Sequence, residues 1–202
     1  EIARGLARVR PMPGRTRLLE GINGSRILDD SYNASPASTL AALETLRSLP
    51  ARRRLVLLGD MAELGDYALE GHRRVGRRCA NVADLLVTKG DLARVAAEAA
   101  LDAGMPADRV HITYSATDAA RVLAEVAAPE DLILIKGSAE ARLEFVTRGL
   151  LRHPAGAEDL LPRQTRGWAQ VRLGRPGRPT WVEVDLEAVA GNVRAIAERV
   201  GP

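Results

Sequence analysis

Short runs of consecutive apolar residues constrain the fold of this 202-residue chain more than any other feature. The runs lie at residues 55–58, 85–87 and 132–135, with a weaker one at 110–113. A continuous apolar run is typical of a parallel strand that is buried on both faces. Stretches with helical periodicity separate the runs, at about residues 66–81, 91–103, 116–127 and 138–152. Strands that alternate with helices predict an α/β fold with a Rossmann-like, doubly wound and mostly parallel sheet.

A short antiparallel hairpin is predicted at the N-terminal edge of this sheet, within residues 16–30. Asn23-Gly24 separates two apolar runs, and both residue types tolerate the positive φ of a tight hairpin turn. The second run leads into Asp29 and Asp30. A helix is expected next, because Ser35 is a suitable N-cap and Pro36 suits the first helical position.

Composition narrows the classes of function. The net charge is only +3, and the basic residues are spread along the chain, which argues against nucleic-acid binding. A single cysteine, Cys79, excludes an internal disulfide and a cysteine metal cluster, and the three histidines have no ligand spacing, so no metal site is predicted. No signal peptide or membrane-spanning apolar run is recognised, so we expect a cytoplasmic protein without membrane partners.

Polar loops follow the predicted strands, at the edge of a parallel sheet where ligands usually bind. Asp30, Asp60 and Lys136 are therefore expected to lie along one edge of the sheet. Residues 29–36, D-D-S-Y-N-A-S-P, could hold a ribose, an adenine edge or a metal, or could simply be capping and turn residues. Residues 59–65 place Asp60 and Glu63 between two glycines. These carboxylates could bind an amine or support a neighbouring loop, and the alternative is a tight turn.

Two further loops carry cations. Lys136, Gly137 and Ser138 follow a predicted strand and stand at the expected start of a helix, where N–H groups and the helix dipole favour an anion. The spacing is not that of a Walker motif, and a lysine with a buried stem and a solvated head is the alternative. Pro13-Gly14-Arg15 precedes the first strand and alone indicates only a loop with an arginine.

In this order and spacing, the four loops resemble the C-terminal domain of the Mur ligases. The resemblance rests on Pro13-Gly14-Arg15, the 29–36 loop, L-G-D-M-A-E-L-G at 58–65, and I-K-G-S at 135–138 with Glu144 after it. It covers about residues 1–152 and implies that residues 1–154 form one domain of a three-domain enzyme. In that family the first domain holds the UDP-sugar end and the central domain holds ATP on a P-loop. The N-terminal and central domains would therefore be missing partners, and this chain alone is expected to be inactive.

The second and third loops resemble most the branch of the family that uses D-alanyl-D-alanine. This branch implies an ATP-dependent, amide-forming ligase of peptidoglycan precursor synthesis. The carboxylate of UDP-N-acetylmuramoyl-tripeptide would become an acyl phosphate, and the amine of D-alanyl-D-alanine would displace phosphate. ATP and Mg²⁺ would be needed by the complete enzyme. The implied catalytic residues are Arg15 and Lys136, the implied ATP-binding residues are Arg15, Asp30, Tyr32 and Asn33, and the implied dipeptide-binding residues are Asp60, Glu63, Lys136 and Ser138.

The C-terminal part of the chain is expected to form an extended tail. Residues 155–178 contain several Pro, Gly and Arg residues and are interpreted as a linker. Residues 179–202 resemble the truncated start of an alanine racemase, through R-P-T-W-V-E-V-D-L-E-A-V-A-G-N-V-R-A-I at 178–196, which implies a ligase–racemase fusion. The chain ends before the lysine that would hold pyridoxal phosphate, so neither that cofactor nor racemase activity is predicted.

The alternative to the ligase function is that the chain is a non-catalytic module that binds a nucleotide or a partner domain, because a P-loop is absent.

Overall fold

The computed structural model describes residues 11–164 of the chain, and within them six strands form one mixed sheet. The strand order is β1-β2-β6-β3-β4-β5. From β2 onward in this order, through β6, β3 and β4 to β5, all neighbouring strands pair in parallel, and β1 is antiparallel to β2, which confirms the predicted fold class. The strand bounds are β1 Arg17–Glu20, β2 Arg26–Asp30, β3 Arg54–Gly59, β4 Leu85–Lys89, β5 Val110–Thr113 and β6 Leu132–Lys136.

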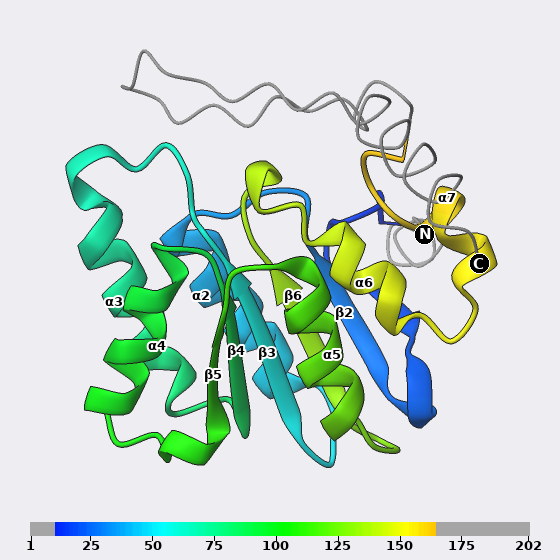
Figure 1. Ribbon diagram of the computed structural model, residues 1–202, viewed down its shortest axis with the longest axis horizontal. Coiled ribbons are helices and arrows are strands. Elements are labelled where there is room, and N and C mark those ends of the chain that lie inside the picture. Colours follow the sequence, from blue (N-terminus) through cyan, green and yellow to red (C-terminus); the bar gives the residue numbers. More distant parts are fainter. Residues whose placement is uncertain (1–10, 165–202) are drawn as a thin grey trace, which may run out of the picture. The chain divides into compact units, whose positions relative to one another are not determined.

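Helices cover both faces of the sheet (Figure 1). Successive side chains of a strand point to opposite faces, so each continuous apolar run feeds two separate cores. One core includes Leu43 from α2 and Val75 from α3, and the other includes Leu123 from α5 and Val146 from α6. The helix bounds are α2 Pro36–Ser48, α3 Ala68–Cys79, α4 Ala93–Asp102, α5 Ala116–Val126, α6 Glu144–Leu150 and α7 Ala157–Leu160. None of the helices within residues 11–164 is long and apolar enough to cross a membrane.

The hairpin between β1 and β2 turns where the sequence predicted. Asn23 and Gly24 have φ values of 54° and 74°, so both residues occupy the left-handed region that this residue pair tolerates. The turn contains a 3-10 segment, Ile22–Gly24. The predicted start of the next helix is confirmed as well. Ser35 accepts a hydrogen bond from the backbone N–H of Ser38, and the Ser38 hydroxyl accepts one from the Ser35 N–H, so the two serines form a capping box.

The helix expected over residues 138–152 is wrong in its first half. Ala139–Ala141 form a single 3-10 turn, Arg142 has a left-handed φ of 49°, and α6 starts only at Glu144. The break brings the Ala141 and Leu143 side chains against Gly59, where an added Cβ would lie 2.7 Å from the Ala141 Cβ. A continuous helix could not place both side chains there. The α-helix expected to start at residue 138 therefore does not stand behind residues 136–138, which precede a 3-10 turn instead.

The described residues extend past residue 152, where the family resemblance ends, into the linker expected over residues 155–178. A 3-10 turn, Pro154–Gly156, leads into α7, and both Ala157 and Leu161 are buried in the core under α5 and α6. The first part of the 155–178 segment thus packs against the sheet domain. The rest of the expected linker and the racemase-like residues 179–202 lie outside the described residues.

Candidate functional site

The loops singled out in the sequence lie along one edge of the sheet. Strands β2, β6 and β3 are neighbours, and the register places Asp30 beside Lys136 and Lys136 beside Leu58. Asp60 follows two residues after Leu58. The prediction that Asp30, Asp60 and Lys136 share one edge is therefore confirmed. Parallel pairing causes this arrangement, because it brings the carboxyl ends of neighbouring strands together.

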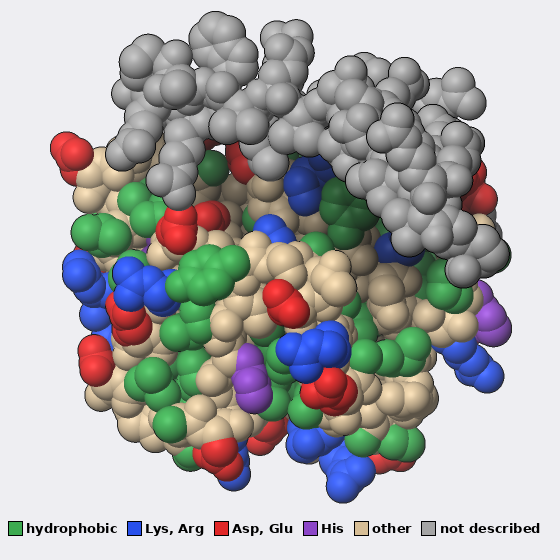
Figure 2. Space-filling model, viewed as in Figure 1, with side chains coloured by type: hydrophobic (Ala, Val, Ile, Leu, Met, Phe, Trp, Pro, Cys, Tyr) green, Lys and Arg blue, Asp and Glu red, His purple; other side chains and the backbone are tan. Residues whose placement is uncertain are grey.

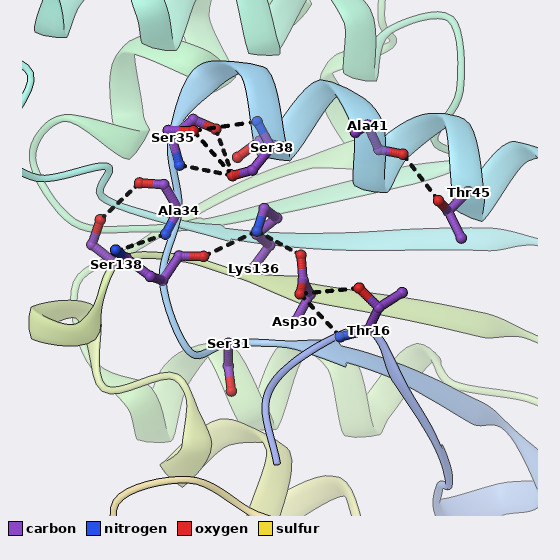
Figure 3. Close-up of polar contacts among 12 residues, drawn as sticks. Thr16, Asp30, Ser31, Ala34, Ser35, Ser38, Ala41, Thr45, Lys136 and Ser138 are labelled. Carbon is purple, nitrogen blue, oxygen red and sulfur yellow. Dashed lines mark hydrogen bonds and ion pairs between the residues drawn. The ribbon is translucent and has the colours of Figure 1, made fainter. Parts of the chain in front are cut away.

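Lys136 and Asp30 form a buried ion pair at this edge (Figure 3). The Lys136 ammonium lies 2.5 Å from Asp30 Oδ2 and also donates to the carbonyl of Asn33 at 3.0 Å. The other oxygen of Asp30 accepts from the backbone N–H of Thr16 at 3.0 Å and from its hydroxyl at 3.2 Å. Lys136 is only 2% exposed, so its charge requires these partners. The pair ties β6 to the 29–36 loop and to the residue after Arg15.

An open pocket of about 450 Å³ lies beside this ion pair. Its wall combines two cations, Arg15 and Lys136, with the carboxylate of Asp30 and the amide of Asn33. Small side chains of α2, Ala41 and Ala42 among them, form the remaining side. The pocket thus offers positive charge, hydrogen-bonding groups and a small apolar wall to one ligand.

Tyr32 joins the Pro13-Gly14-Arg15 loop to the 29–36 loop. Its backbone N–H donates to the carbonyl of Gly14 at 3.0 Å, and its half-exposed ring lies 4.2 Å from the Arg15 guanidinium carbon. Gly14 has a φ of 71°, and an added Cβ would lie 2.9 Å from the Tyr32 nitrogen. A glycine is therefore needed at this contact. Two motifs that are distant in the sequence form one surface here.

Ser138 and Asp60 connect the 59–65 loop to its neighbours. The buried Ser138 hydroxyl accepts from the backbone N–H of Ala62 at 2.8 Å and donates to the carbonyl of Ala34 at 3.3 Å. The Asp60 carboxylate accepts from the backbone N–H of Ala93 at 2.7 Å, at the start of α4. Both side chains therefore support the loops from within. Glu63 is exposed and has a left-handed φ of 59°.

Two supporting residues were not identified from the sequence. His72 is buried in α3, where Nδ1 donates to the carbonyl of Ala68 at 2.6 Å and Nε2 accepts from the backbone N–H of Met61 at 3.0 Å. Burial lowers the pKa of His72, so the ring stays neutral and holds the start of the 59–65 loop. A lone histidine in a helical pattern gives no sequence signal for this contact.

Lys89 is the other missed residue, at the end of β4. Its ammonium donates to the carbonyl of Ala141 at 3.1 Å. Burial lowers the pKa of Lys89, and the charges of Asp60 and Glu144 oppose this effect only in part. The position of Lys89 at the end of a predicted strand was the available signal, since other strand ends carry the candidate residues.

Glu144, the acidic residue that follows the I-K-G-S motif, is fully buried between two arginines. Its carboxylate lies 2.6 Å from Arg142 and 2.8 Å from Arg163. Burial raises the pKa of a carboxyl group, but the hydrogen bonds from Arg163 and Arg142 outweigh burial and lower the pKa of Glu144. Glu144 is therefore ionised at neutral pH.

Basic and acidic side chains are interspersed over the face of the molecule in Figure 2. That face carries no broad surface of one charge among the described residues. Over residues 11–164, no group of three or more His, Cys, Asp or Glu side chains is arranged to hold a metal ion.

Residues 14–139 match the family described as Mur ligase, glutamate ligase domain. Because this match covers more than half of the chain, the chain belongs to the Mur ligase family and corresponds to its C-terminal domain. Similar curated proteins are UDP-N-acetylmuramoyl-tripeptide–D-alanyl-D-alanine ligases. The one from Bacillus subtilis (strain 168) is 33% identical over 156 residues, which are 76% of this chain and 34% of the relative. The one from Escherichia coli (strain K12) is 35% identical over 151 residues, 74% of this chain and 32% of the relative.

Solved structures with a similar fold come from the same kind of ligase. The MurF ligase from Thermotoga maritima, in complex with ADP, superposes with a TM-score of 0.60 and 26% identity, over 73% of this chain and 35% of that chain. MurF from Acinetobacter baumannii gives a TM-score of 0.61 and 26% identity, over 72% of this chain and 32% of that chain. The chain spans about a third of the length of the curated relatives that it matches.

Proposed function

We propose that this chain is the C-terminal domain of an ATP-dependent ligase that joins D-alanyl-D-alanine to UDP-N-acetylmuramoyl-tripeptide. The observation that carries the proposal is the convergence of Arg15, Asp30 and Lys136 around one open pocket at the strand ends. The names of the curated relatives supply the reaction. The pocket supplies a place where this chain would meet the substrates.

The proposed reaction forms an amide in two steps. The carboxylate of the tripeptide attacks the γ-phosphorus of ATP, and the bond from that phosphorus to ADP breaks, which gives an acyl phosphate. The amine of D-alanyl-D-alanine then attacks the acyl carbon, phosphate leaves with the bonding electrons, and the amine loses a proton. Negative charge builds on the phosphoryl oxygens and on the tetrahedral intermediate, so fixed cations beside them lower the barrier.

The nucleotide would contact the Arg15 side of the pocket. An arginine suits phosphate oxygens, because its guanidinium is always charged and can donate two parallel hydrogen bonds. The exposed Arg15 would serve this purpose, while Asp30, Tyr32 and Asn33 would meet the ribose and adenine. The Asn33 amide oxygen accepts from the backbone N–H of Ala34 at 2.9 Å, so its NH₂ group is the part that would donate to a ligand.

The dipeptide would be received near Lys136 and the 59–65 loop. Since only a single 3-10 turn and no α-helix directly follows Ser138, the attraction for the dipeptide carboxylate would come from the Lys136 charge and not from an α-helix dipole. Two of the three N–H groups of Lys136 are used by Asp30 and Asn33. Asp60 and Ser138 would shape this region through the loops that they hold. The exposed Glu63 would take part in binding the dipeptide.

Further domains would complete the site. The sequence has no Walker motif, so we propose that an N-terminal and a central Mur ligase domain supply the UDP-sugar site and the P-loop. Mg²⁺ usually binds through phosphates and one or two carboxylates, and the described residues have no ligand cluster of their own. The metal would therefore be held by the nucleotide and the central domain. A cytoplasmic location fits an enzyme that uses ATP and a UDP-linked precursor.

The second candidate is a non-catalytic module that binds a nucleotide or a partner domain, which the missing P-loop favours for the chain in isolation. The resemblance of residues 178–196 to an alanine racemase supports a separate proposal of a ligase–racemase fusion. A racemase sequence with its cofactor lysine after residue 202 would support the fusion, and an unrelated sequence there would exclude it.

An omission assay separates the two functions. The complete ligase, with the two preceding domains, is supplied with ATP, Mg²⁺, UDP-tripeptide and D-alanyl-D-alanine, and each component is left out in turn. We expect amide product and phosphate only with all four present, and none with the 202-residue chain alone. Absence of product from the complete protein, or equal phosphate release without the dipeptide, would contradict the proposal.

A further inference from the structure

Arg163 closes the C-terminal end of the described chain onto the end of β2. One terminal nitrogen, Nη1, donates to the carbonyl of Tyr32 at 2.9 Å, and the other, Nη2, donates to the carbonyl of Ser31 at 2.8 Å. Nη2 also lies 2.8 Å from Glu144 Oε2, and Nε donates to Oε1 of the same carboxylate at 3.2 Å. One guanidinium thus bridges two backbone carbonyls of the 29–36 loop and a carboxylate of α6.

The bridge is buried, and its geometry suits only an arginine. The Arg163 side chain is 4% exposed and the Glu144 side chain is fully buried, so each charge depends on the other. The planar fork of five N–H donors can serve three acceptors at once, which a lysine ammonium on a flexible stem does poorly. Arg163 also adopts a left-handed φ of 55°, a conformation that non-glycine residues rarely take.

Arg163 is connected to Arg15 through Tyr32, because Arg163 binds the Tyr32 backbone and Arg15 packs on the Tyr32 ring. The backbone of Tyr32 is fixed on both sides, by Arg163 at its carbonyl and by Gly14 at its N–H. The Tyr32 ring carries the Arg15 guanidinium at 4.2 Å. The residue before Arg163, Pro162, lies against Gly14, where an added Cβ would be 3.0 Å from the Pro162 Cγ. Residues 162–163 therefore contact both loops of the proposed nucleotide site, the 13–15 loop and the 29–36 loop.

We propose that Arg163 is a positioning residue for the nucleotide site. It holds Ser31 and Tyr32 against Glu144 and thereby fixes the Tyr32 ring and the Arg15 guanidinium. Both Glu144 and Arg163 lie beyond residues 14–139, which match the family, so the family match does not assign this role. The inference rests on the proposed function, because it concerns the nucleotide side of that same pocket.

The test compares two arginines that bind the same C-terminal segment. Arg17 donates to the carbonyls of Asp159 and Leu160, both at 3.3 Å, so Arg17→Ala loosens this segment without removing a bond to the 29–36 loop. In the complete ligase, Arg163→Ala should lower kcat/KM for ATP about tenfold, the scale expected from losing charge-assisted hydrogen bonds worth about 1.5 kcal/mol. The KM for D-alanyl-D-alanine should stay within about twofold, and Arg17→Ala should leave both parameters within about twofold.

Arg163→Lys and Glu144→Gln are the second pair of variants, and they keep the side-chain volume if Arg163→Ala fails to fold. Arg163→Lys should lower kcat/KM for ATP nearly as far as Arg163→Ala, because an ammonium cannot bridge both carbonyls. Glu144→Gln should have a smaller effect, because the carbonyl bonds remain. Equal losses in Arg17→Ala and Arg163→Ala, or an unchanged kcat/KM for ATP in Arg163→Lys, would overturn the inference. A wild-type ligase without activity would instead overturn the proposed function.

Discussion

Lys136 and Asp30 occupy the last positions of two neighbouring parallel strands, and their side chains meet at 2.5 Å. This contact joins β2 and β6 beyond their backbone pairing. It also fixes the two loops that carry Asn33 and Thr16, because both residues bind the pair directly. The pair therefore stabilises the ends of both strands and also lines the pocket.

Replacing Lys136 should lower the free energy of unfolding of the domain. Lys136→Ala leaves the Asp30 carboxylate buried without its cation, which costs roughly 3–5 kcal/mol when a buried pair is broken. Lys136→Met with Asp30→Asn removes both charges and should recover a large part of the lost stability. Urea unfolding of the chain measures both values. A Lys136→Ala variant as stable as the wild type would contradict the described burial of the pair.

Replacing Arg15 should affect turnover and not folding. Arg15 is exposed, so Arg15→Ala should change the free energy of unfolding by less than about 0.5 kcal/mol. If its guanidinium meets the phosphoryl group in the transition state, kcat of the complete ligase should fall roughly 100-fold or more. Arg52→Ala, at another exposed arginine, serves as the control and should keep the wild-type rate. An Arg15→Ala enzyme of normal rate would remove Arg15 from the mechanism.

Ionisation of the buried Asp29 should lower the free energy of unfolding as the pH rises. Neither of the Asp29 carboxylate oxygens has a hydrogen-bond partner of normal geometry within residues 11–164. The neighbouring Ser31 points away from the Lys136–Asp30 pair (Figure 3). Burial raises the pKa of Asp29 from 3.8 to about 6, although Ser31 and Gly14 lie near enough to offset part of this. Because the folded-state pKa is the higher one, the stability cost is absent below pH 4 and complete above pH 6.

Asp29→Asn should therefore be more stable than the wild type above pH 7, by about 3 kcal/mol for a shift of about two pKa units. The difference should shrink as the pH falls from 6 and vanish below 4. Unfolding curves at several pH values measure it, with the exposed Asp108→Asn as the control. A difference that stays constant over this range would show that the Asp29 charge is not responsible.

Ser138→Ala tests whether the buried serine hydroxyl supports the two loops that it joins. The change removes the acceptor for the Ala62 N–H and the donor to the Ala34 carbonyl, so it should cost about 1–3 kcal/mol of stability. Ser48→Ala, which removes one exposed hydroxyl from α2, should cost less than about 0.5 kcal/mol. Thermal unfolding compares the two. A stability unchanged by Ser138→Ala would argue against the supporting role.

The sequence predicted the parts of the fold that depend on local pattern. Continuous apolar runs identified the buried strands, Asn23-Gly24 identified the turn, and Ser35 with Pro36 identified the start of α2. The convergence of Asp30, Asp60 and Lys136 followed from parallel pairing alone. These predictions need only the periodicity of the chain and the chirality of its connections.

Contacts between distant residues could not be predicted in this way. The break before α6 depends on how Ala141 and Leu143 pack against Gly59, about 80 residues earlier in the chain. Glu144 finds its partner in Arg163, within a segment whose composition resembles a linker. His72 supports Met61 through a single hydrogen bond. No local pattern encodes such pairings, because each depends on tertiary packing.

Hydrogen–deuterium exchange of the complete ligase, with and without a non-hydrolysable ATP analogue, shows whether the nucleotide binds in the pocket beside Lys136 and Asp30. If the pocket beside Lys136 and Asp30 closes over the nucleotide, backbone amides of residues 14–16 and 30–34 should exchange more slowly when the analogue binds. The amides of β5, at the far edge of the sheet, should exchange at an unchanged rate. Saturating analogue that leaves both loops unprotected would contradict nucleotide binding in this pocket.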